Sequence, residues 1–368
     1  MIPCNDFLNW LETAGIDFFA GVPDSLLKDF CACLADTRPP ASQVIAANEG
    51  GAVALAAGHW LAARRPALVY MQNSGQGHAV HPLASLADPD VYSIPMLLLV
   101  GWRGEPGVHD EPQHVKQGKI TLSLFETMGI PVSVLPADPD AAQRAVADSV
   151  RLALDGNRPV ALVVRKGTFE KHVLQNKPAD IAPLRRETAV ETVLQALPPA
   201  AVVVSTTGMI SREVYETRAR LGHDHSRDFL TVGSMGHALM IALGIAKAQP
   251  SRPVVCLDGD GASLMQMGNL AIAGQSGCSN LYHIVLNNAA HDSVGGQPTV
   301  GGAVSLPSVA AACGYRIASS RDALFAASPA PSFLEIRVAK GARPDLGRPK
   351  EPPQTNKALF MATLERLP

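Results

Sequence analysis

Two short polar motifs in the second half of the chain have the residue types that bind a metal ion and a phosphate group. Gly259-Asp260-Gly261 directly follows an apolar run, and Asn287-Asn288 follows the next one. If these runs are neighbouring parallel strands, the carboxylate and the carboxamide meet at the carboxyl edge of one sheet. Hard oxygen ligands beside a phosphate-binding turn suit Mg²⁺. A lone Gly-Asp-Gly is common in turns, but the two motifs together indicate a Mg²⁺-diphosphate site.

A glutamate in the first half is a second candidate functional residue. Glu49 follows a predicted strand over residues 43–47 and precedes Gly50 and Gly51, which let a ligand approach the backbone closely. Read alone, Glu49 could be an ordinary first-turn glutamate stabilised by the helix dipole. Its position between a strand and two glycines favours a functional role.

The elements that must position these residues alternate between strand and helix. Short aliphatic runs are separated by Ala- and Leu-rich stretches at helical spacing, a pattern typical of parallel sheets buried on both faces. The predicted strands of the first half cover residues 16–20, 43–47, 67–72, 96–102, 131–135 and 159–165. Those of the second half cover residues 201–206, 229–232, 253–257, 281–286, 315–318 and 332–338. A last helix is predicted over residues 355–366.

A break in this alternation predicts two domains. Residues 166–186 collect Lys, Pro, Asp and Asn without an apolar period, which is typical of a linker. We therefore predict an α/β protein with two doubly wound parallel-sheet domains, over residues 1–180 and 187–368. The linker lies at about 166–186, and its length leaves no room for a central third domain.

The composition favours a folded protein that acts on a small molecule. Lys and Arg number 31 against 33 Asp and Glu, and no basic run breaks this balance, so we expect neither a nucleic-acid nor a membrane partner. The six cysteines are scattered without a C-x-x-C pair and are predicted to be reduced thiols. The N-terminus has no basic segment before an apolar stretch, and we expect a cytoplasmic location.

Taken together, the motifs resemble those of thiamine diphosphate (ThDP) enzymes. Gly-Asp-Gly followed by Asn-Asn resembles the metal-diphosphate motif of their PP domain, and Glu49 stands where their PYR domain carries a glutamate. Further segments resemble the family of phosphonopyruvate decarboxylase and sulfopyruvate decarboxylase: residues 21–25, 71–75, 101–107, 110–114, 232–237 and 291–299. Six residues depart from the pattern of that family: His78, His81, Leu239, Met240, Gln266 and Ala289.

The resemblance implies roles for residues of both domains. Glu49 would hydrogen-bond N1′ of the aminopyrimidine ring and promote the imino tautomer that activates the thiazolium ring. Asp260, Asn288 and the Ala290 carbonyl would bind Mg²⁺, and Met235 would support the bent cofactor from below. The cofactor-binding set implied for the PP domain is Thr207, Gly208, Gly233, Ser234, Met235, Gly259, Asp260, Gly261, Ala262 and Asn288.

Other polar residues are candidates for catalysis or for binding a substrate. Asp24 resembles the acidic residue that some ThDP decarboxylases use for proton transfer, and His114 is the alternative proton donor. Arg103 is suited to a doubly charged head group, because a guanidinium binds such a group through two hydrogen bonds. Ser25 and His291 complete the candidate substrate set. The non-functional alternatives are that Arg103 forms a surface salt bridge and that His114 and His291 are ordinary histidines of surface loops.

The reaction implied by the resemblance is the decarboxylation of 3-phosphonopyruvate to phosphonoacetaldehyde and CO₂. The substrate would be a 2-oxoacid with a second anionic group. The two enzyme alternatives are a sulfopyruvate decarboxylase and a ThDP carboligase. The non-enzyme alternative is a binding protein of the same fold without catalytic activity. We also expect a homodimer or a larger assembly with active sites shared between subunits, because the PYR domain of such enzymes faces the PP domain of another subunit.

Overall fold

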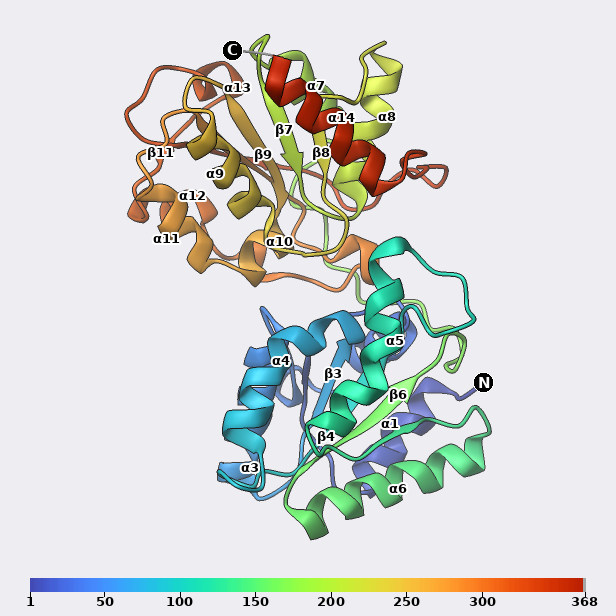
Figure 1. Cartoon of the computed structure of the whole chain (residues 1–368). Helices are drawn as coiled ribbons and strands as arrows, with labels where there is room; N and C mark the ends of the chain where they lie inside the picture. The colour runs from blue at the N-terminus through green and yellow to red at the C-terminus, as the bar shows by residue number, and fades with distance from the viewer. Residues whose placement is uncertain (367–368) are drawn as a thin grey trace. The chain divides into compact units, whose positions relative to one another are not determined.

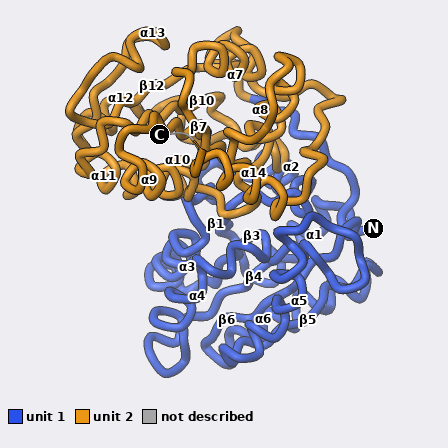
Figure 2. Tube along the Cα trace, turned by 45° about the horizontal axis from the view of Figure 1, so that its top comes forward, with its two compact units in different colours: residues 1–177 blue, residues 178–368 orange. Residues whose placement is uncertain are grey.

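The computed structural model describes residues 1–366 and divides the chain into two compact units. Unit 1 comprises residues 1–177 and unit 2 comprises residues 178–368 (Figure 2). The division falls within the stretch 166–186, in which the sequence places a linker. Each unit is built on its own six-stranded sheet.

The sheet of unit 1 is parallel throughout, with strand order β2-β1-β3-β4-β6-β5. Both β4 and β6 are buried along their whole length, as expected for strands covered by helices on both faces. The strands are β1 (Phe19–Gly21), β2 (Gln43–Ile45), β3 (Leu68–Gln72), β4 (Met96–Gly101), β5 (Val132–Val134) and β6 (Pro159–Val164).

Two hydrophobic clusters hold the helices of unit 1 on opposite faces of the sheet (Figure 1). On one face pack α1 (Cys4–Thr13), α2 (Lys28–Thr37) and α6 (Pro139–Gly156), with edge-on rings of Phe7 and Phe30 between them. On the other face pack α3 (Glu49–Ala63), α4 (Gln76–Pro82) and α5 (Pro112–Thr127). The two layers of helices make the sheet doubly wound.

Local signals explain where the helices begin and end. The side chain of Asn48 accepts a hydrogen bond from the Gly51 backbone N–H at 2.9 Å and so caps α3, which ends at Arg64 in the left-handed conformation. Helix α6 begins in the same way with Asp138 as its cap and Pro139 in its first turn. The cap of α3 matters for function, because the next residue is Glu49.

Unit 2 repeats the topology of unit 1. Its parallel sheet has the order β11-β12-β10-β9-β7-β8. When the strands of each unit are numbered from one, both sheets read 2-1-3-4-6-5. The strands are β7 (Val202–Ser205), β8 (Asp228–Leu230), β9 (Val254–Gly259), β10 (Leu281–Asn287), β11 (Arg316–Ile317) and β12 (Ser332–Arg337).

The helices of unit 2 also cover both faces of its sheet (Figure 1). One cluster contains residues of α7 (Arg186–Gln195), α8 (Met209–Arg220) and α13 (Arg321–Leu324). The other contains residues of α9 (Ala238–Ala248), α10 (Asp260–Met265), α11 (Gly268–Gly274), α12 (Leu306–Ala312) and α14 (Pro353–Arg366). The predicted fold class, two doubly wound parallel-sheet domains, is confirmed.

The predicted elements differ from the observed ones mainly at their ends. The strand predicted over residues 229–232 is observed at Asp228–Leu230, because Asp228 is fully buried and paired with Arg218 at 2.9 Å. A charged residue can thus enter a buried strand when its counter-charge lies beside it. The cysteines are free, as predicted. Within residues 1–366, no helix combines the length and apolarity needed to cross a bilayer.

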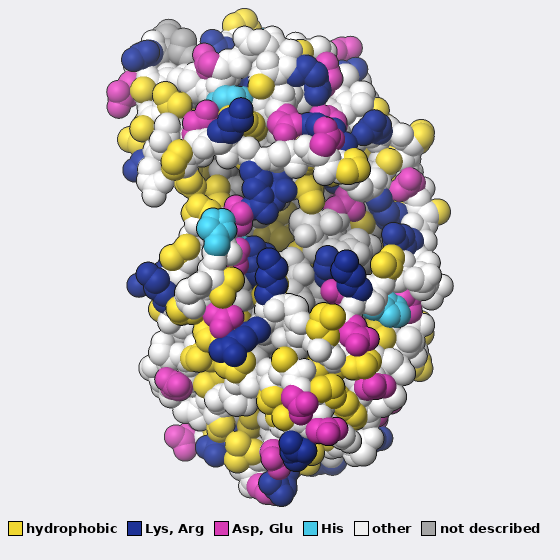
Figure 3. Space-filling model, turned by 90° about the vertical axis from the view of Figure 1, so that its right-hand side faces the viewer, with side chains coloured by type: hydrophobic (Ala, Val, Ile, Leu, Met, Phe, Trp, Pro, Cys, Tyr) yellow, Lys and Arg dark blue, Asp and Glu magenta, His cyan; other side chains and the backbone are white. Residues whose placement is uncertain are grey.

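The surface in view carries charged side chains of both signs (Figure 3). On the face drawn in Figure 3, acidic and basic side chains are interspersed. This mixed pattern agrees with the balanced composition of the chain.

Candidate active site

A pocket in unit 2 collects the residues that follow β7, β9 and β10. These strands are neighbours in the sheet, so their carboxyl ends open onto the same edge, and β7 and β9 flank the point where the strand order reverses. The pocket is lined by Arg186, Thr206, Thr207, Met209, Ile210, Met235, Gly259, Asp260, Gly261, Ala262, Leu286, Asn288, Ala290, His291, Asp292 and Ser293.

The structure brings together most of the cofactor-binding residues predicted for this domain. Nine predicted residues line the pocket: Thr207, Met235, Gly259, Asp260, Gly261, Ala262, Asn288, Ala290 and His291. Gly208, Gly233 and Ser234 are not among the lining residues. They are sequence neighbours of the lining residues Thr207 and Met235. The Gly233 backbone N–H donates a hydrogen bond to Thr207 Oγ1 at 3.1 Å.

The loop that carries Met235 is held in an unusual conformation. Gly233, Ser234 and Gly236 all have positive φ angles, of 69°, 47° and 84°. Left-handed backbone is unfavourable for a residue with a side chain, so the strain at Ser234 must be offset by the surrounding contacts. The loop places Met235 in the wall of the pocket, in the position predicted for the residue that supports the cofactor.

Asp260 is the buried acid of the pocket. Its carboxylate accepts a hydrogen bond from the Thr299 hydroxyl and one from the Asn288 backbone N–H, at 3.4 Å in the latter case. Burial raises the pKa of Asp260 to about 6. No Lys, Arg or His of the described residues forms an ion pair with it. The environment therefore lacks a positive charge that would stabilise the ionised form.

The side chain of Asn288 is fixed at both ends. Its Oδ1 accepts a hydrogen bond from the Ala290 backbone N–H at 3.1 Å, and its Nδ2 donates to Asp292 Oδ2 at 2.6 Å. Asp292 thereby determines which end of the amide is the oxygen. Asp260, Asn288 and Ala290 line one pocket and offer a carboxylate, an amide oxygen and a carbonyl, which are the ligand types that Mg²⁺ prefers. The residues present therefore fit a Mg²⁺ ion.

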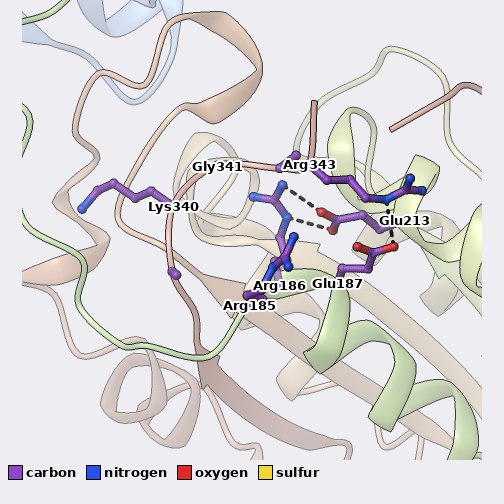
Figure 4. A pocket seen from close by; sticks show the side chains of 9 residues that line it. Arg185, Arg186, Glu187, Glu213, Lys340, Gly341 and Arg343 are labelled. Atoms are coloured by element: carbon purple, nitrogen blue, oxygen red, sulfur yellow. Dashed lines mark hydrogen bonds and ion pairs between the residues drawn. The ribbon is translucent and has the colours of Figure 1, made fainter. Parts of the chain in front are cut away.

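A buried arginine holds Asp292, the hydrogen-bond partner of Asn288, in place. Arg186 Nη1 donates to Asp292 Oδ2 at 2.7 Å, while its Nε and Nη2 donate to the two carboxylate oxygens of Glu213 at 2.9 and 3.1 Å. Figure 4 shows the two parallel bonds to Glu213, with Lys340 pointing away from them. The side chains of Arg186 and Glu213 are 5% and 3% exposed, so their charges depend on each other for solvation.

In unit 1, Glu49 occupies the first turn of α3 and is buried. Its Oε2 lies 2.6 Å from His78 Nδ1 of α4, and its Oε1 lies against Gly75, where any side chain would overlap it. The carboxylate is thus placed by the cap of α3, by a glycine and by a histidine. Glu49 stands where the sequence predicts it, at the start of the helix that follows the second strand.

A second group of charged residues follows β1 and β4. Arg103 pairs with Asp110 through two hydrogen bonds, at 2.8 Å from Nε and 2.5 Å from Nη2, and donates from Nη1 to Ser25 Oγ at 2.7 Å. Ser25 Oγ in turn lies 3.4 Å from Asp24 Oδ1. Three predicted residues, Asp24, Ser25 and Arg103, therefore form one hydrogen-bonded chain.

The pKa values of the two candidate proton donors are shifted in opposite directions. Asp24 is fully buried, and burial raises its pKa to about 6, with Arg103 acting against this shift. Burial, together with the nearby charge of Arg103, lowers the pKa of His114 to about 4. His114 is therefore neutral at pH 7, as is His291, whose pKa burial lowers to about 4.

These clusters also contain residues that the sequence does not mark as functional, among them Asp110, Asp292, His78, Arg186, Glu213 and Thr299. Asp110 and Asp292 lie inside segments that resemble the family, and Asp292 directly follows His291. His78 was noted only as a departure from the family pattern, and Arg186 only as the end of the linker. Asp110 lies seven positions from its partner Arg103, and the contacts of Arg186 with Glu213 and Asp292 depend on the tertiary fold.

Comparison with known proteins agrees with this geometry. The model of the thiamine pyrophosphate enzyme N-terminal TPP binding domain matches residues 5–124, and that of the C-terminal TPP binding domain matches residues 207–339. The first match lies in unit 1 and the second in unit 2. The chain belongs to the thiamine pyrophosphate enzymes, and it binds thiamine diphosphate, which is the same cofactor under another name.

Full-length relatives define its place in the family more closely. The chain is 38% identical over 379 residues to phosphonopyruvate decarboxylase of Streptomyces hygroscopicus, and the match covers 96% of this chain and 92% of the relative. It is 36% identical over 377 residues to phosphonopyruvate decarboxylase of Streptomyces viridochromogenes, with the same coverage. It is 25% identical over 311 residues to sulfopyruvate decarboxylase of Methanosarcina acetivorans, covering 78% and 76%. The chain is a thiamine diphosphate-dependent decarboxylase.

Substitution of the buried Arg186 tests how much its ion pairs with Glu213 and Asp292 stabilise unit 2. Arg186→Met leaves the carboxylates of Glu213 and Asp292 without a counter-charge, so we expect the free energy of unfolding to fall by about 3–5 kcal/mol. The matched control is Arg185→Met, because Arg185 is the neighbouring residue but is exposed. Its substitution should change stability by less than about 0.5 kcal/mol. Urea unfolding followed by fluorescence measures both; equal stability of the two variants would contradict the assignment.

Proposed function

We propose that the chain decarboxylates 3-phosphonopyruvate to phosphonoacetaldehyde and CO₂, with Mg²⁺ and thiamine diphosphate as cofactors. The observation that carries the proposal is the match to phosphonopyruvate decarboxylases over 96% of the chain. The site supports it, because the acid of the PYR domain and the oxygen ligands of the PP domain are all present. A protein that only bound the cofactor would not need Glu49.

The PP-type unit would hold the diphosphate end of the cofactor. Asp260, Asn288 Oδ1 and the Ala290 carbonyl would bind Mg²⁺, and the ion would supply the positive charge that buried Asp260 lacks. Thr207, Gly208, Gly233, Ser234, Gly259, Gly261 and Ala262 would surround the diphosphate, and Met235 would support the cofactor between its two rings.

The PYR-type unit would control the protons. Glu49 would exchange a proton with N1′ of the aminopyrimidine ring through one carboxylate oxygen. The electron pair released as CO₂ leaves is accepted by the thiazolium ring of the bound cofactor, which is the chemistry that the cofactor supplies. Asp24 and His114 are the two candidates that would deliver a proton to the carbon left by CO₂, and Asp24 is favoured because its pKa of about 6 lies closer to neutral pH than that of His114, which is about 4.

Arg103 is the residue best suited to the second anionic group of the substrate. Asp110 and Ser25 hold its guanidinium in one orientation, so little side-chain entropy is lost when an oxyanion binds. His291, which is neutral and lines the pocket of unit 2, is a further candidate contact. A sulfonate carries the same geometry as a phosphonate with less charge. Sulfopyruvate is therefore the alternative substrate, favoured by the relative from Methanosarcina acetivorans.

The substrate assay separates these options. The purified enzyme with Mg²⁺ and thiamine diphosphate should release CO₂ from 3-phosphonopyruvate faster than from sulfopyruvate or pyruvate, with phosphonoacetaldehyde seen by phosphorus NMR. Glu49→Gln should retain the cofactor while kcat falls by about 10² or more, the usual range for a proton-transfer group. Faster release from sulfopyruvate would assign the alternative substrate, and a coupled product would indicate a carboligase. No CO₂ from any 2-oxoacid would refute the proposal.

The metal assignment is tested by binding rather than by turnover. Asp260→Ala removes the one carboxylate among the proposed ligands, so we expect the variant to lose measurable Mg²⁺-dependent binding of thiamine diphosphate in calorimetry. Ser293→Ala is the matched control, because Ser293 lines the same pocket but is not a proposed ligand. Cofactor affinity that is equal in the two variants would overturn the ligand set.

We infer further that the enzyme works as a homodimer or a larger assembly, with Glu49 of one subunit and Asp260 of another serving one active site. The outward face of α3 supports an interface, because it exposes Ala54, Leu55, Gly58 and Leu61 with no charged side chain among them. An obligate interface of this kind is apolar and excludes water from the reaction. Closed symmetry would give two sites per dimer.

The assembly is tested on the exposed face of α3. Leu55→Asp should shift the protein towards monomer and abolish activity, because burying a carboxylate in an apolar interface is strongly unfavourable. Leu152→Asp on α6 is the control, since Leu55 and Leu152 are 37% and 40% exposed. Sedimentation equilibrium measures the mass. In addition, mixing Glu49→Gln with Asp260→Ala subunits should restore up to about half of the sites per heterodimer. Activity retained in a monomeric Leu55→Asp protein would disprove shared sites.

A further inference from the structure

His78 holds one oxygen of the proposed proton-transfer residue. It lies on α4, which packs against α3 (Figure 1), and its Nδ1 is 2.6 Å from Glu49 Oε2. The Glu49 side chain is 6% exposed and that of His78 is 31% exposed. The hydrogen bond therefore joins a desolvated carboxylate to a ring that still reaches solvent.

Glu49 is the charged group that acts on His78. The hydrogen bond to Glu49 raises the pKa of His78 above its usual value, and burial acts in the opposite direction. On α4 the other titratable side chain is His81, which is exposed. The adjoining turns, residues 73–75 and 83–87, contain no acid or base. On α3, His59 is engaged with Asp17 at 3.2 Å, and Arg64 and Arg65 lie beyond the far end of the helix.

The second carboxylate oxygen of Glu49, Oε1, has different surroundings from Oε2. Oε1 lies against the backbone of Gly75, and no hydrogen bond to it is found within residues 1–366. The two oxygens are thus distinguished by the protein. One is occupied by a donor, and the other is left to a partner from outside the chain.

We propose that His78 is a positioning residue for Glu49: its Nδ1–H donates to Oε2, fixes the plane of the carboxylate, and leaves Oε1 to exchange the proton with the aminopyrimidine ring. The inference rests on the proposed function, since it takes Glu49 as the residue that faces the cofactor. Without the donor the carboxylate can rotate, and a misplacement of about 1 Å in such a group can cost about 10²-fold in rate.

The ion pair itself can be tested in the protein without cofactor. With ¹³C-labelled histidine, NMR titration should give His78 a pKa above the ordinary value of a histidine, and Glu49→Gln should lower it towards that value. The sign follows from the pair: the imidazolium form is favoured below the raised pKa and is lost as pH rises through it. A His78 pKa that is not raised, or that Glu49→Gln leaves unchanged, would overturn the proposal.

The positioning role is tested on bound thiamine diphosphate by the rate of hydrogen–deuterium exchange at thiazolium C2. We expect His78→Ala to slow exchange by about tenfold or more, and His78→Asn, which keeps a neutral N–H donor at similar reach, to restore most of the rate. His81→Ala, one turn further along the same helix, is the matched control and should leave the rate unchanged.

A pH profile separates positioning from a merely structural role. In the wild type the exchange rate should change slope at the pH where His78 titrates, and in His78→Asn that inflection should disappear. Equal exchange rates in His78→Ala and His81→Ala, or an inflection that persists in His78→Asn, would refute the role. Failure of the proposed substrate would appear instead in the CO₂ and phosphorus assays, with the exchange results intact.

Discussion

The need to pair every buried charge organises both halves of the molecule. Six carboxylates are buried in the described chain: Asp24, Glu49, Glu213, Asp228, Asp258 and Asp260. Glu49 has His78, Glu213 has Arg186 and Asp228 has Arg218; His283 Nε2 lies 3.5 Å from Asp258 Oδ2, and Arg103 acts on Asp24. Within residues 1–366, Asp260 alone has no such partner. A desolvated carboxylate without a counter-charge is strongly unfavourable, so its position favours a cation supplied from outside the chain.

The shared topology explains why these charges gather at one edge of each sheet. In strands buried on both faces, polar residues are tolerated mainly where the strand ends, and in parallel sheets those ends lie together. In unit 2 the proposed metal ligands follow the third and fourth strands, and the proposed cofactor-binding residues follow all of the first four. In unit 1 Asp24 and Arg103 follow the first and fourth, and Glu49 follows the second. The same strand order thus carries metal and diphosphate ligands in one unit and proton-transfer groups in the other.

The sequence predicted the fold and the residues next to the strands, because both are local signals. Apolar runs located all twelve strands, and Glu49, Asp260 and Asn288 were found because each lies within four residues of the end of such a run. The partners of these residues could not be found in this way. Arg186 reaches Asp292 across 106 positions, and His78 reaches Glu49 across 29, so both contacts exist only once the helices pack. Asp228 was missed as a strand residue for the same reason, since its counter-charge Arg218 comes from another element.

Close packing fixes three of the buried acids, Asp24 and Glu49 in unit 1 and Asp260 in unit 2. Glu49 lies against Gly75 and Asp24 against Gly101, and a Cβ at either glycine would overlap the carboxylate. A Cβ at Gly301 would lie 2.6 Å from Asp260 Oδ2, closer than such contacts allow. In each case a bare backbone lies close to one side of the acid, while a hydrogen-bond donor meets the carboxylate: His78 for Glu49, the Leu26 N–H for Asp24 and Thr299 for Asp260. Desolvation alone would neutralise these acids, and pairing alone would leave them mobile in solvent. Both constraints are needed for a carboxylate that is ionised and held in one orientation, whether it binds a cation or exchanges a proton.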